Sequence, residues 1–317
     1  MVSKWVPRVW LVLSLLLAVP FAAAAESRDE VLEEKLFQAY AKIVDDTSSA
    51  KIGLTQAEAS KLFNSALHHP VANLATETLL KYDPKGIIGF CFGRASTVHL
   101  IARRMGLKET SIRKLFVAGD LRSNPEKPEW RFHVTTLIKG TNNKWYAIDP
   151  IMTPPVAPGG PIPVEEWIAI VKDTWDYKNA AHFYVTQANA MTPDIRVDAD
   201  GKTGKHLIEL PFAPEKDRGF KKVTFGKFDA YMPSVEAEAI HFLQPSERDS
   251  DSRFLFLSIT IEGLGEISFN NYFVDLLKSF SSREPMRNSA LAPESAAAAP
   301  KAVENKARSL HSFKLGK

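Results

Sequence analysis

The sequence is poor in cysteine: Cys91 is the one cysteine among 317 residues. A single thiol excludes a disulfide within the chain. Proteins exported to oxidising compartments usually carry cysteines in pairs or none, so an unpaired thiol is informative. Cys91 is either a small buried hydrophobic residue or a nucleophile. With 45% hydrophobic residues, the chain has enough apolar content for a core in one large domain or two small ones.

The sequence also lacks a strong excess of charge of either sign. Lys and Arg number 40 against 37 Asp and Glu, which gives a formal net charge of +3 at pH 7. Nucleic-acid-binding proteins typically concentrate positive charge in a patch or stripe. Nothing in this sequence indicates a nucleic-acid partner.

The apolar run near the N-terminus, residues 9–19, is too short for a membrane helix, which needs roughly 20 residues. Lys4 and Arg8 precede this run, and three alanines at 23–25 provide the small residues that signal peptidase requires. Residues 1–25 are therefore predicted to be a secretory signal peptide, with an uncleaved anchor as the alternative. We expect an exported protein, periplasmic or secreted, with no stable membrane span after cleavage.

Residues 26–80 are predicted to be helical, either as a cap on the next domain or as a pro-segment. Apolar residues recur there at helical spacing, and Thr55 with Glu58 is typical of a capping box. His68 and His69 are adjacent, so on a helix they would point about 100° apart, unlike the i, i+4 pair of a zinc-binding helix. We expect no metal site.

The chain beyond residue 190 changes in character. Polar turns and short strand candidates fill residues 191–282, and residues 253–261 give the clearest strand because both of its faces are largely apolar. We predict a C-terminal α+β or β-rich unit for substrate or envelope contact. Residues 283–317, with repeated alanines and scattered basic residues, are predicted to be a flexible tail.

Cys91 begins a segment with helical periodicity. One face of this helix would carry Ala95, Val98, Ala102 and Met105, and Gly106 supplies a stop. Cys91 is therefore expected at a helix N-terminus. There, unpaired backbone N–H groups and the positive end of the helix dipole favour a thiolate and can receive an oxyanion.

A predicted β-hairpin carries a histidine and an aspartate. Residues 132–139 and 144–148 have strand composition on either side of a turn at 140–143. If the strands pair about Thr141, His133 and Asp149 are direct cross-strand neighbours with Cβ atoms about 4.5–5.5 Å apart. A carboxylate at that distance fixes the imidazole tautomer and leaves the other ring nitrogen for a thiol. The alternative is a surface histidine and a turn aspartate.

A proline-rich loop follows the hairpin and leads into a short helix. The loop, residues 150–163, contains six prolines and is a candidate rim of the substrate cleft. Residues 164–172 are predicted to be helical. Trp167 and Trp175 are interpreted as core or cleft-lining residues.

The order of the candidate residues resembles the core of transglutaminase-like and papain-like cysteine enzymes, because His133 follows Cys91 by 42 residues and Asp149 follows His133 by 16. More closely, four segments resemble the bacterial protein-glutaminase (protein-glutamine deamidase) domain. They are GFCFGRA at 89–95, FVAGDL at 116–121, WRFHV at 130–134 and AIDP at 147–150. The resemblance covers roughly residues 81–185.

This resemblance implies a fold and roles for individual residues. The fold would be α+β with a papain/transglutaminase-like core, in which the helix carrying Cys91 packs on an antiparallel sheet carrying His133 and Asp149. The catalytic domain would span residues 81–190, between the helical N-terminal segment and the C-terminal β-rich unit. Cys91 would be the nucleophile, His133 the general base and then acid, and Asp149 the orienting carboxylate. Trp130 is a candidate substrate-binding residue.

We therefore expect an exported cysteine hydrolase that needs no cofactor and acts on proteins or peptides with accessible glutamine. It would deamidate the glutaminyl side chain through a thioester and release ammonia. The triad alone does not select this reaction. A lysine amine in place of water would give transglutaminase-like crosslinks, and attack on a peptide bond would give a cysteine peptidase. A non-catalytic envelope-binding protein is a further alternative.

Overall fold

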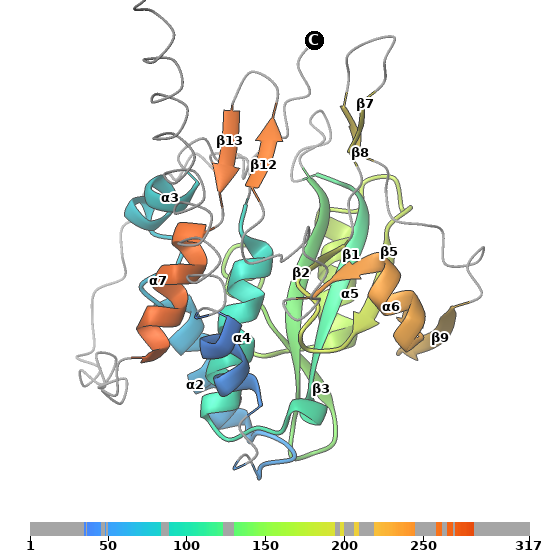
Figure 1. Ribbon diagram of the computed structural model, residues 1–317. Helices are drawn as coiled ribbons and strands as arrows, with labels where there is room; N and C mark the ends of the chain where they lie inside the picture. Colours follow the sequence, from blue (N-terminus) through green and yellow to red (C-terminus); the bar gives the residue numbers. More distant parts are fainter. Residues whose placement is uncertain are drawn as a thin grey trace, which may run out of the picture.

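The computed structural model describes residues 35, 37–45, 48, 50–83, 89–122, 130–193, 197–199, 206–208, 219–244, 258–261, 265–268 and 270–281. The predicted signal peptide (1–25) and the predicted tail (283–317) lie outside the described residues. The described part has the predicted α+β class, with helices packed on a central sheet (Figure 1). Within it, no helix combines the length and the apolar composition needed to cross a membrane.

The central sheet has seven strands in the order β4-β3-β2-β1-β5-β10-β9. Neighbouring strands run antiparallel, except that β10 pairs with β5 in parallel. The strands are β1 (Ile112–Leu121), β2 (Trp130–Lys139), β3 (Trp145–Ile148), β4 (Ile162–Pro163), β5 (His182–Thr186), β9 (Phe220–Phe225) and β10 (Phe228–Pro233). Strands from beyond residue 190 thus extend the sheet that carries His133.

The remaining strands form three two-stranded sheets. These pair β6 (Thr192–Pro193) with β11 (Phe242–Leu243), β7 (Val197–Ala199) with β8 (His206–Ile208), and β12 (Ser258–Ile261) with β13 (Gly265–Ser268). The helices are α2 (Gln56–Leu67), α3 (Thr76–Tyr82), α4 (Cys91–Arg104), α5 (Val164–Thr174), α6 (Val235–His241) and α7 (Asn270–Ser281), with a 3₁₀ turn η1 at Glu109–Ser111. Residues 37–44 are also helical.

Alternating side chains of β1 divide the core into two halves, as expected for a strand buried on both faces. Phe116 and Ala118 pack with α2, α4 and α7, whereas Leu115 and Val117 pack with α5. Figure 1 shows α2, α4 and α7 gathered on one side of the sheet. Helix α4 is buried along nearly its whole length because it lies between the sheet and these other helices.

Two helix starts agree with their sequence signals. Thr55 and Glu58 form the predicted capping box at the start of α2, with Thr55 Oγ1 accepting from Glu58 N at 3.2 Å and Thr55 N donating to Glu58 Oε2 at 2.9 Å. Helix α4 begins at Cys91, as predicted, and Gly106 follows its end with φ of 84°.

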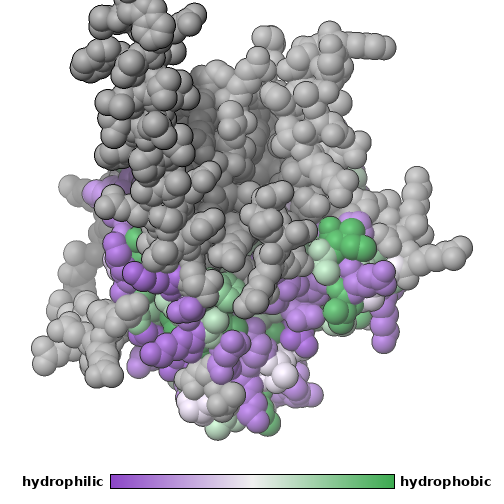
Figure 2. Space-filling model, viewed as in Figure 1, coloured by the Kyte–Doolittle hydropathy of each residue, from purple (hydrophilic) through white to green (hydrophobic). Residues whose placement is uncertain are grey.

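On the face shown in Figure 2, hydrophilic residues cover most of the described surface, and apolar residues form smaller patches.

The β2–β3 hairpin has a different register from the prediction. Thr136 pairs with Ile148 and Lys139 with Trp145, so the hairpin is centred on Asn142 and not on Thr141. The reason is the turn: Asn143 adopts a left-handed conformation with φ of 64°, and Gly140 N donates to Lys144 O at 2.7 Å to close a three-residue loop. The direct opposition predicted for His133 and Asp149 is therefore wrong.

The shift moves every cross-strand partner by two positions, which preserves the face on which each side chain lies. Asp149, directly after β3, comes level with Thr135 and diagonal to His133. Diagonal neighbours are about 7–8 Å apart at their Cα atoms, which long side chains can bridge. The predicted irregular loop at 150–163 also differs in one respect, because its last two residues form β4 and pair with β3.

Candidate active site

The turn before Cys91 is held by two charged side chains that are both 5% exposed. Asp83 Oδ2 accepts a hydrogen bond from Gly89 N at 2.8 Å, and Arg94 Nη2 donates to Gly89 O at 2.6 Å. Gly89 and Phe90 have positive φ angles of 71° and 45°, and a left-handed conformation is uncommon for a phenylalanine. Non-glycine residues held in this region cluster at functional sites.

This turn places Cys91 as the first residue of α4. The first hydrogen bond that closes a helical turn runs from Arg94 N to Phe90 O at 3.0 Å. The N–H groups of residues 91–93 precede it and have no partner within the helix. They give the space around the sulfur a positive electrostatic character.

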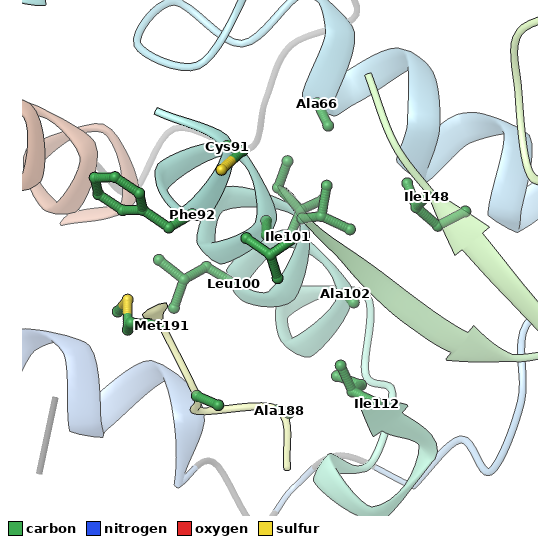
Figure 3. Close-up of a cluster of buried hydrophobic side chains, with 14 of the residues drawn as sticks. Ala66, Cys91, Phe92, Leu100, Ile101, Ala102, Ile112, Ile148, Ala188 and Met191 are labelled. Atoms are coloured by element: carbon green, nitrogen blue, oxygen red, sulfur yellow. The ribbon is translucent and has the colours of Figure 1, made fainter. Parts of the chain in front are cut away.

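Cys91 shares a buried cluster with several aromatic rings. Cys91 is 9% exposed, and it packs in one cluster with rings from α4 and α7. The ring of Phe90 stacks on Tyr272 with centroids 4.6 Å apart, and Phe92 stacks on Phe273 at 6.3 Å. Figure 3 shows Cys91 in the first turn of α4, with the ring of Phe92 directed toward α7. Helix α7 therefore covers the end of α4 where the thiol lies.

His133 and Asp149 are joined directly. His133 Nε2 lies 2.8 Å from Asp149 Oδ2, and the two residues are 4% and 2% exposed. The same carboxylate oxygen accepts a hydrogen bond from Trp167 Nε1 at 3.0 Å. Strand β3 ends at Ile148, opposite Thr136, so His133 lies on a part of β2 beyond the end of its neighbour β3.

The electrostatics favour a protonated imidazole. Burial has the largest single influence on His133 and lowers its pKa, because it disfavours the charged ring. The charge and hydrogen bond of Asp149, followed by the hydrogen bond and charge of Cys91, outweigh burial and raise the pKa of His133 to about 9. The three predicted residues thus interact within one buried cluster. With Nε2 bonded to Asp149, Nδ1 is the ring nitrogen left for the thiol.

Other sequence predictions have different outcomes. Trp130 pairs with Leu121 through its backbone, but its side chain lies outside the described part, so its substrate-binding role stays a prediction. Trp167 is buried in the core, and the sequence did not reveal its hydrogen bond to Asp149. The contact of Tyr272 with Phe90 was also missed, because residues so distant along the chain give no local pattern.

Among the described residues, no group of three or more His, Cys, Asp or Glu side chains could hold a metal ion.

Comparison with known families identifies the domain around this cluster. A family model described as "Glutaminase" matches residues 61–171, a range that contains Cys91, His133 and Asp149. The chain contains a protein-glutaminase domain. The family resemblance inferred from the sequence is thereby confirmed. The matched range begins within α2 and ends within α5.

Solved structures that are similar to the chain carry related names. A mutant of pro-protein-glutaminase is 19% identical with a TM-score of 0.33, and the match covers 46% of this chain and 52% of that one. This chain therefore spans about half the length of that relative. Two structures of protein-glutaminase, one of them from Chryseobacterium proteolyticum, are 18% identical with TM-scores of 0.32 and 0.31. Those matches cover 50% of this chain and 82% and 80% of theirs. No curated protein gives a significant match.

Proposed function

We propose that this protein is a cysteine-dependent protein-glutamine deamidase in which Cys91, His133 and Asp149 form the catalytic triad. The observation that carries the proposal is the buried cluster of these three residues inside a protein-glutaminase domain. The family match supports a glutaminyl carboxamide as the group attacked. The cluster supplies the chemistry that such an attack requires: a thiol, an imidazole and an orienting carboxylate.

The first half of the reaction forms a thioester. The imidazole of His133 takes the proton from the Cys91 thiol, and Asp149 stabilises the imidazolium that forms. The sulfur attacks the carboxamide carbon, and the carbonyl oxygen becomes an oxyanion within reach of the N–H groups at the start of α4. When the C–N bond breaks, nitrogen takes the proton from His133 and leaves as ammonia.

The second half restores the enzyme. Water attacks the thioester carbon and gives a proton to the now neutral His133, which acts as the general base. The C–S bond breaks, the sulfur leaves as a thiolate paired with the imidazolium, and the product is a glutamate side chain. Asp149 holds the imidazole in one orientation through both halves.

The protein is proposed to be exported through the signal peptide at 1–25 and to act on proteins or peptides in the periplasm or outside the cell. Within residues 26–80, we propose that the part from α2 onward is a permanent cap and not a removable pro-segment. Leu62 and Phe63 of α2 are at most 4% exposed and share one core cluster with Ile101 of α4. Cleavage at residue 80 would expose that apolar surface to water.

The decisive experiment measures ammonia released from casein, or from a short glutamine-containing peptide, by the chain beginning at residue 26. We expect ammonia from the wild-type protein and none from Cys91→Ser, which retains the size of the side chain but lacks the thiol. Ammonia accompanied by crosslinked products would replace deamidation with transglutamination, which also releases ammonia, and cleaved products without ammonia would replace it with proteolysis. No reaction with either substrate would favour a binding protein.

A further inference from the structure

Trp167 is the one described residue, besides His133, whose side chain donates a hydrogen bond to Asp149 Oδ2. It lies on α5 and is 0% exposed, with Nε1 3.0 Å from that oxygen. Its ring also stacks on the imidazole of His133, with centroids 6.1 Å apart and planes at 21°. A buried indole usually finds an acceptor for its N–H. Here the acceptor is a carboxylate that already pairs with His133.

Asp149 needs an anchor of this kind because of where it lies. It follows the last residue of β3, outside the hydrogen-bonded ladder, so the strand does not fix the orientation of its side chain. Its other oxygen, Oδ1, has only a long contact of 3.4 Å with Ile151 N. Oδ2 is therefore held mainly by two N–H groups, from His133 on β2 and from Trp167 on α5.

Helix α5 can supply a fixed point for the indole. Ile168 and Val171 on the same helix are 0% exposed and pack with the sheet in the cluster that contains Trp167. Side chains in a close-packed core have little freedom to shift. The packing of α5 thus helps to fix the position of Trp167 Nε1.

We propose that Trp167 is a positioning residue for the Cys91–His133–Asp149 triad. Its indole N–H holds Asp149 Oδ2 where this oxygen can pair with His133 Nε2, so the imidazole keeps its orientation toward Cys91. The role depends on the proposed function, because it matters for catalysis only if the triad is catalytic. The competing role is that of a core residue whose N–H merely needs an acceptor.

The experiment compares Trp167→Phe with the matched control Trp145→Phe. Phenylalanine retains an aromatic ring at position 167 but removes the N–H donor. Trp145 is a partly buried tryptophan of the same core cluster, at the end of β3 remote from Asp149, so its variant makes the same chemical change away from the triad. Melting temperatures of both variants record the cost to packing.

The main readout is the titration of the His133 ring, followed by NMR of protein labelled at histidine. In Trp167→Phe, we expect the apparent pKa of His133 to fall by about one unit or more from its wild-type value, because a loosened carboxylate supports the imidazolium less well. We expect kcat for ammonia release to fall roughly 10- to 100-fold with KM little changed. Trp145→Phe should match the wild type in both measurements.

An unchanged or raised pKa of His133 in Trp167→Phe would overturn the positioning role and leave Trp167 as a core residue. An equal fall in both variants would do the same. The NMR titration does not require catalysis. The positioning role of Trp167 and the deamidase activity can therefore be refuted separately. A wild-type protein that releases no ammonia but shows the selective pKa shift would refute the deamidase and retain the positioning role.

Discussion

The ring of Tyr272 lies directly against Gly93, where a Cβ atom would come within 2.5 Å of Tyr272 Cε1. Position 93 therefore has room only for glycine while α7 is docked on α4. This contact lies two residues from Cys91 and joins segments about 180 residues apart in the sequence. The contact between Tyr272 and Gly93 therefore links the access of reagents to the Cys91 sulfur with the docking of α7.

Gly93→Ala should displace Tyr272 and loosen α7, because backbone on one side and a buried ring on the other leave the new methyl group no space. We expect a loss of about 1–3 kcal/mol in the free energy of unfolding, as is typical of overpacking. Alkylation of Cys91 by iodoacetamide should become faster. The control is the double variant Gly93→Ala with Tyr272→Ala, in which the clash is gone. A cost of Gly93→Ala that is the same in both backgrounds would contradict the contact.

The pairing of His133 with Asp149 should make stability depend on pH in a defined direction. The pKa of His133 is raised to about 9 from its ordinary value of 6.5. The stabilisation from its protonation is therefore present in full below about pH 6.5 and is lost as the pH rises through about 9. Melting temperatures between pH 6 and 10, compared with those of His133→Gln, isolate this contribution. The advantage of the wild type over the variant should shrink as the pH rises, and a constant difference would refute it.

The titration of Lys114 should make stability depend on pH in the opposite direction. Its ammonium is 2% exposed and donates to Ala95 O at 2.9 Å and Thr136 Oγ1 at 3.0 Å. Burial lowers its pKa to about 7, so stability should rise with pH between about 7 and the ordinary value of 10.5. Lys114→Met removes this titration, and Thr136 Oγ1 still donates to Ala95 O at 2.6 Å.

We expect the melting temperature of Lys114→Met, relative to that of the wild type, to be higher at pH 6 than at pH 10. Thermal unfolding across that range measures the difference. Lys172→Met is a useful control, because Lys172 lies on α5 with a quarter of its side chain exposed and pairs with Asp176 at 3.0 Å. A Lys114→Met difference that does not vary with pH would show that the pKa of this lysine is not lowered in the folded protein.

Removal of residues 26–80 should abolish cooperative folding if α2 is a permanent cap. Leu62 of α2 is 0% exposed, and even Leu62→Ala should cost about 2–5 kcal/mol. Circular dichroism during thermal unfolding, for chains beginning at residue 26 and at residue 81, gives the comparison. A chain from residue 81 that melts cooperatively and releases ammonia would restore the pro-segment interpretation.

Local sequence patterns predicted the parts of the site that local physics determines. The helical periodicity after Cys91 correctly predicted where α4 begins, because the signal lies within one element. Strand alternation correctly predicted that His133 and Asp149 share a face, but the centre of the hairpin depended on the left-handed conformation of Asn143. An asparagine pair in a turn does not specify which residue adopts it.

The rest of the site depends on contacts between distant segments. The indole N–H of Trp167 has no local signature, because a tryptophan on an amphipathic helix has the same pattern whether its N–H meets a carbonyl or a carboxylate. The covering of α4 by Tyr272 likewise depends on how α7 docks. These features follow from tertiary packing, which local sequence patterns do not specify.

The burial of Cys91 near the docked helix α7 also bears on its chemical durability. A chain with one cysteine cannot protect its thiol by forming an internal disulfide. Burial limits the access of peroxide and small disulfides to the thiol, so sulfenic acid and mixed disulfides should form faster when α7 is loosened. In an oxidising medium, the lifetime of the reduced sulfur would then be set by the dynamics of one C-terminal helix.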